Sequence, residues 1–105
     1  MYRNRKEAEE EIIRGYQRDE QMMILVFAQW CVNQGLDPHE MYLRAYPDQA
    51  ENPALAQAIE LTVPKEEAGE IEAETVLGVL SLFGNDELGF VVTEEADRLK
   101  KKRRP

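Results

Sequence analysis

The stretch MMILVFAQWCV, residues 22–32, decides the fold of this chain. Ten of its eleven residues are apolar, and only Gln29 interrupts them. On a helix such a run is apolar around the whole circumference, so it must be buried on more than one side, in a core or between subunits. It has about half of the roughly 20 residues that a membrane-spanning helix needs, so it does not predict a membrane segment.

This run belongs to a longer segment, Arg3 to Gln34, in which only Gly15 disfavours a helix. One glycine costs only about 1 kcal/mol against alanine in a helix interior. Apolar residues recur there at helical spacing, as Ile12, Tyr16, Met23, Phe27 and Trp30. We therefore expect one long N-terminal helix, amphipathic at its start and buried at its end.

Turn signals divide the rest of the chain into shorter helices. Asp37-Pro38 and Asn52-Pro53 each join a capping side chain to the residue best suited to the first helical position, and they predict helices over 39–46 and 54–61. The stretch 64–83 fits one further helix, although Gly69 and Gly78 weaken its continuity.

Residues 90–92, Phe-Val-Val, are compatible with a short extended segment, and Thr93 with the cap of a last helix. The sequence thus predicts an all-α fold, a small bundle of about five helices with one long central N-terminal helix. We expect residues 1–97 to form a single helical domain and residues 98–105 a basic C-terminal tail.

The end of the chain, GFVVTEEADRLKKKRR, loosely resembles the last strand and the following helix of winged-helix regulators. The resemblance consists of β-branched residues, a threonine cap and an amphipathic helix. The preceding strand of a wing is missing, so the resemblance does not assign the chain to that family.

Charge is unevenly distributed along the 105 residues, whose net charge is -8. The first six residues have a net charge of +3 and the last eight of +6, while the residues between them hold all 21 acids and a net charge of -17. The bases of the tail are Arg98, Lys100, Lys101, Lys102, Arg103 and Arg104. This tail fits three uses: a solubilising helix end, contact with an acidic protein surface, and binding of nucleic acid.

Few residues could support catalysis. The single cysteine, Cys31, and the single histidine, His39, are separated by the Gly35 turn, so a thiol–imidazole pair is geometrically allowed. Cys31 fits better as a small buried hydrophobe. One cysteine permits no internal disulfide and gives no sign of an oxidising compartment, and no leader sequence opens the chain, so we expect a cytoplasmic protein.

Metal binding has one candidate. Glu66, Glu67, Glu70 and Glu74 would share a face of the helix predicted over 64–83, where carboxylates could hold a hard cation. A solvated acidic face explains them as well, and no cysteines or histidines stand at zinc-ligand spacing. We expect no catalytic residue, no cofactor and no metal.

These features favour a non-enzymatic protein that acts by protein–protein interaction, with a second copy of the chain as the expected partner. The reason is an excess of apolar helix surface, which a domain of this size has difficulty covering. The residues expected at the interface are Ile12, Tyr16, Met23, Phe27, Trp30, Gly78 and Leu82. Two alternatives stay open: a nucleic-acid-associated regulator that uses the basic termini, and an acidic mimic of nucleic acid that uses the carboxylates of 66–74.

Overall fold

The computed structural model describes residues 5–49 and 51–103, and the side chains of 18–49 and 51–102. In this part of the chain six α-helices follow one another: α1 (Arg5–Asn33), α2 (Pro38–Ala45), α3 (Pro53–Leu61), α4 (Lys65–Ala68), α5 (Ala73–Leu82) and α6 (Asp86–Arg103). These residues form no strand, and the predicted all-α fold is confirmed.

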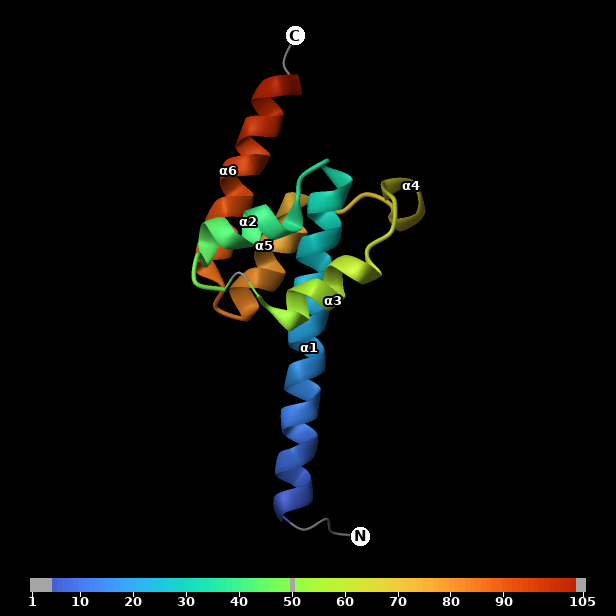
Figure 1. The fold of residues 1–105 in the computed structure, drawn as a ribbon, viewed down its shortest axis with the longest axis vertical. Helices are drawn as coiled ribbons and strands as arrows, with labels where there is room; N and C mark the ends of the chain where they lie inside the picture. Colours follow the sequence, from blue (N-terminus) through green and yellow to red (C-terminus); the bar gives the residue numbers. More distant parts are fainter. Residues whose placement is uncertain (1–4, 50, 104–105) are drawn as a thin grey trace.

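α1 is the axis of the molecule. The other described helices gather around its C-terminal half, while its N-terminal half projects alone, and the end of α6 projects in the opposite direction (Figure 1). The molecule measures 63 × 31 × 23 Å, and its Cα radius of gyration is 15.9 Å. A compact domain of this length would have a radius of gyration of about 13 Å, so the two projecting helix ends account for the elongation.

The apolar run of 22–32 lies at the centre of the core. From this run the buried apolar residues are Met23, Ile24, Phe27, Ala28, Trp30 and Cys31. The other helices contribute Met41, Tyr42, Leu55, Ala58, Val76, Leu80, Leu88, Val91 and Val92 to the same core. The long helix is therefore central, because α2, α3 and α5 pack against its apolar circumference, and α6 packs in turn against α2 and α5.

Gln29, the interruption in the apolar run, binds the backbone of the loop after α3. Its side-chain amide donates to the Val63 carbonyl at 2.8 Å and accepts from the Val63 N–H at 3.0 Å. It also donates to Asn33 Oδ1 at 3.0 Å, and the Asn33 amide donates to the Gly69 carbonyl at 2.9 Å. Gln29 and Asn33 are buried, and these bonds supply the partners that buried polar groups require. They fasten the connection between α3 and α5 to α1.

The predicted helix starts are present. The Asp37 carboxylate accepts a hydrogen bond from the His39 N–H at 2.9 Å, and the Asn52 side chain accepts one from the Leu55 N–H at 3.1 Å. α1 ends before Gly35, whose φ of 75° lies in the left-handed region that glycine adopts without strain.

The predicted extended segment at 90–92 is wrong, because these residues lie inside α6. That helix begins at Asp86, so Thr93 is not its cap; the Thr93 hydroxyl donates to the Gly89 carbonyl one turn back, at 2.9 Å. Without a strand before the helix, the resemblance to winged-helix regulators has no structural counterpart.

The single helix predicted over 64–83 is also wrong. The chain forms α4 and α5, which are separated by residues 69–72. Gly69 ends α4 with a φ of 79°, a conformation that the helix cannot continue. The residues expected as a separate basic tail continue α6 as far as Arg103.

Candidate interaction site

The residues predicted at an interface lie in three different environments. Met23, Phe27 and Trp30 are at most 3% exposed, because the chain's own helices cover them, so their apolar character requires no second subunit. Gly78 and Leu82 lie exposed one turn apart on α5, and Leu82 is 84% exposed. The two remaining residues, Ile12 and Tyr16, belong to α1 but lie outside the residues whose side chains the structure describes.

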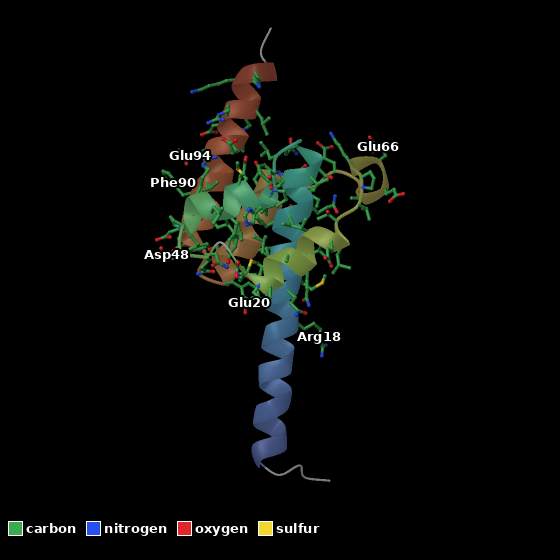
Figure 2. The ribbon with its side chains drawn as sticks, in the orientation of Figure 1. Arg18, Glu20, Asp48, Glu66, Phe90 and Glu94 are labelled. Carbon is green, nitrogen blue, oxygen red and sulfur yellow. The ribbon has the colours of Figure 1, made fainter. Side chains whose placement is uncertain are left out.

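The N-terminal part of α1 leaves the core as a projecting helix. Residues 18–22 are all exposed, and Met23 is the first buried residue of α1 after them. Figure 1 shows no other described helix beside the part of α1 that precedes them, and Figure 2 shows Arg18 and Glu20 where α1 enters the globule. We call residues 5–22 the stalk. Most helical stability in proteins comes from tertiary packing of an amphipathic face, and no other described helix supplies such packing to the start of α1.

A groove of about 280 Å³ lies at the other end of α1, between that helix, the loop before α5, and the helices α5 and α6. We call it the acidic groove. Its apolar lining consists of Trp30, Ile71, Ala73, Leu77, Ala96 and Leu99. Trp30 is buried and the other five are partly buried, so the floor of the groove is the edge of the core.

Charged side chains surround this apolar floor. The groove is lined by four exposed carboxylates, Glu70, Glu72, Glu74 and Asp97, and by one exposed ammonium group, that of Lys100. Its formal net charge is therefore negative. An apolar floor with an acidic rim is complementary to a segment that carries both apolar and basic side chains.

Glu95 is a buried charge on the side of α6 that faces α2. It is 2% exposed, and its Oε2 lies 3.5 Å from Arg44 Nη1 and 3.4 Å from Arg98 Nη2. These contacts are ion pairs that leave Oε2 without a hydrogen bond. Arg44 also donates to the exposed Glu94 at 3.3 Å. The cluster joins α2 to α6, so Arg98, predicted as part of the basic tail, contributes to the folded globule.

The remaining bases of the predicted tail lie at the projecting end of α6. Lys100, Lys101 and Lys102 are exposed there. Arg103 is the last residue of α6, and its side chain is not among those described; Arg104 lies outside the described residues.

Cys31 has no exposed surface. Burial raises the pKa of its thiol to about 12, with smaller contributions from the carboxylates of Asp37 and Glu95. A thiol with this pKa is protonated at neutral pH and is not a nucleophile. His39, which the sequence allowed but did not favour as a partner of this thiol, is exposed in the first turn of α2.

The described residues contain no group of three or more His, Cys, Asp or Glu side chains placed to hold a metal ion. The predicted row of glutamates on one helix face does not form, because the helix ends at Gly69 and leaves Glu66 and Glu67 on α4, Glu70 in the loop and Glu74 on α5. None of the described helices is long and apolar enough to cross a membrane.

The fold and its surfaces define a small all-helical protein with a projecting helix and an acidic groove. The chain belongs to the YxiS family, whose model matches residues 4–97. It is 51% identical to the uncharacterised protein YxiS of Bacillus subtilis (strain 168) over 87 residues, which cover 82% of this chain and 91% of that relative. No solved structure matches this chain. Neither the family description nor the relative's name states an activity or a partner.

Proposed function

We propose that this protein is a non-enzymatic helical protein that acts by protein–protein interaction, and that its partner is a second copy of itself. The stalk is the observation that supports this proposal most directly, because residues 18–22 of a long helix remain exposed. A helix without neighbours gains packing energy only from another molecule. Leu82 and Phe90, 84% and 68% exposed, add apolar surface on the globule.

The state of Cys31 supports a non-catalytic role. Nucleophilic catalysis by cysteine needs an accessible thiolate, whereas this thiol is buried and its pKa is about 12. A cysteine that remains free and buried also fits the reducing cytoplasm, the location that we propose.

The proposal is tested by the mass in solution, measured by light scattering after gel filtration over a hundredfold range of concentration. We expect a dimer, and Ile12→Asp or Tyr16→Asp should weaken its association at least about tenfold, because an ionised carboxylate is costly to bury in an apolar contact. Gln17→Asp makes the same charge change at another register position of α1 and serves as the control. A wild-type monomer at high micromolar concentration would remove the proposal.

A second candidate function is a nucleic-acid-associated regulator. The observation in its favour is the projecting end of α6, which exposes Lys100, Lys101 and Lys102. If these ammonium groups bind phosphates of duplex DNA, the logarithm of the binding constant should fall with the logarithm of salt concentration by about 0.9 for each phosphate neutralised. A titration with duplex DNA at several salt concentrations tests this, and reversing the three charges to glutamate should abolish the binding.

A further inference from the structure

The first six residues, MYRNRK, have a composition that complements the acidic groove. They contain the bases Arg3, Arg5 and Lys6, the apolar residues Met1 and Tyr2, and no acid. The groove offers the reverse, an apolar floor bordered by four carboxylates against one ammonium group. Segment and groove could therefore pair both their apolar and their charged groups.

The two cannot meet within one chain while α1 is helical. The groove is lined by Trp30, and α1 is continuous from Arg5 to Asn33. At a rise of about 1.5 Å per residue, Arg5 and Trp30 are separated by about 37 Å along the helix axis. The four residues before Arg5 span at most about 14 Å when fully extended. The stalk thus holds the N-terminal segment too far from its own groove.

We infer that residues 1–6 of one copy bind the acidic groove of a second copy. This inference rests on the proposed self-association and names the surface that carries it. In a twofold dimer the same contact is made twice, because the segment of each copy meets the groove of the other. The two α1 helices then run antiparallel, and each stalk gains a neighbour.

The end of α6 is the rival occupant within the chain. It has enough positive charge, but beyond Leu99 its sequence is KKKRRP, which contains no large apolar side chain. Leu99 already lines the groove of its own chain. The N-terminal segment supplies both kinds of side chain, so it satisfies the apolar floor as well as the acidic rim.

Charge reversal tests the pairing. A groove variant, Glu70→Lys with Glu72→Lys and Glu74→Lys, and an N-terminal variant, Arg3→Glu with Arg5→Glu and Lys6→Glu, should each self-associate at least about tenfold more weakly than wild type, because like charges then face each other. An equimolar mixture of the two variants restores opposite charges at both contacts. We expect this mixture to form dimers with an affinity close to that of wild type.

A matched control makes the same change of charge outside the groove, with Glu60→Lys, Glu66→Lys and Glu67→Lys on α3 and α4. It should dimerise like wild type alone. Mixed with the N-terminal variant, it restores opposite charges at only one of the two contacts, so this mixture should dimerise more weakly than the mixture of the groove and N-terminal variants. Trp30, the single tryptophan of the chain, gives a local readout, since its emission should change with concentration in wild type and not in the groove variant. Thermal unfolding of each variant verifies that it is folded.

The outcomes separate this inference from the proposed function. A monomeric wild type overturns both. A wild-type dimer whose stability is unaffected by the groove and N-terminal variants overturns the inference and leaves self-association intact. Equal weakening by the control variant, or failure of the mixture to dimerise, also overturns it. Loss of dimers on Lys100→Glu, Lys101→Glu and Lys102→Glu, with the N-terminal variant unaffected, would assign the groove to the end of α6 instead.

Discussion

At the scale of single residues, the burial of Cys31 makes the free energy of unfolding depend on pH. Its side chain has no exposed surface, and burial, with Asp37 and Glu95, raises the thiol pKa from 9.0 to about 12. Above pH 9 the thiol ionises in the unfolded chain and stays protonated in the folded one, so rising pH favours unfolding. We predict that the free energy of unfolding falls by roughly 1 kcal/mol between pH 8 and pH 10 because of this group.

Urea unfolding of the wild type and of Cys31→Ala at both pH values measures this contribution. The substitution lowers stability at both pH values by leaving a small cavity, but it should also reduce the loss between them. Burial raises the pKa of Tyr42 and Tyr46 as well, so both proteins keep some loss in the same direction. Equal losses in the two proteins would show that the thiol does not titrate as described.

Gln29 shows what the sequence could and could not reveal about a residue. As the one interruption in the apolar run, it was visible in the sequence as an exception on a helix that had to be buried. Its partner was not visible, because Val63 lies 34 residues away and offers only its backbone. Buried amides need partners, but periodicity does not identify them.

At the scale of elements, Gly69 and Gly78 should respond to alanine in opposite directions. Gly69 has a φ of 79° and ends α4, so Gly69→Ala should cost about 1–3 kcal/mol of unfolding free energy. Gly78 lies inside α5, where an added Cβ meets no atom within 4 Å, so Gly78→Ala should add up to about 1 kcal/mol. Urea unfolding of both variants tests this, and a stabilised Gly69→Ala would contradict the assigned helix break.

Helix α6 explains why one element was misread in the sequence. Leu88, Val91, Val92 and Glu95 are all buried and follow helical spacing. The last member of this stripe is the carboxylate of Glu95, which pairs with Arg44 and Arg98. Because a carboxylate is not counted in an apolar pattern, the helical spacing was missed and residues 90–92 were interpreted as a short extended segment. The helix caps at Asp37 and Asn52 are local signals and were predicted correctly.

The acidic groove could not be predicted, because it depends on tertiary structure. Its lining comes from the end of α1, from the loop and helix at 70–77, and from α6, and no local pattern places these segments side by side. The sequence did reveal the charges, an acidic middle and two basic ends. The fold then places the start of α1 and the end of α6 at opposite extremes of an elongated molecule (Figure 1).

At the scale of the whole molecule, self-association should determine the stability of the stalk. Residues 23–33 of α1 lie in the core, whereas no other described helix lies beside the N-terminal part of α1 (Figure 1), and most helical stability in proteins comes from tertiary packing. The amides of 23–33 should therefore be protected from hydrogen exchange at every concentration. Those of 5–22 should be protected only at concentrations where the dimer is populated. In Ile12→Asp the stalk should exchange rapidly at all concentrations. Stalk protection that does not change on dilution of the wild type would show that the helix is stable alone and would remove its need for a partner.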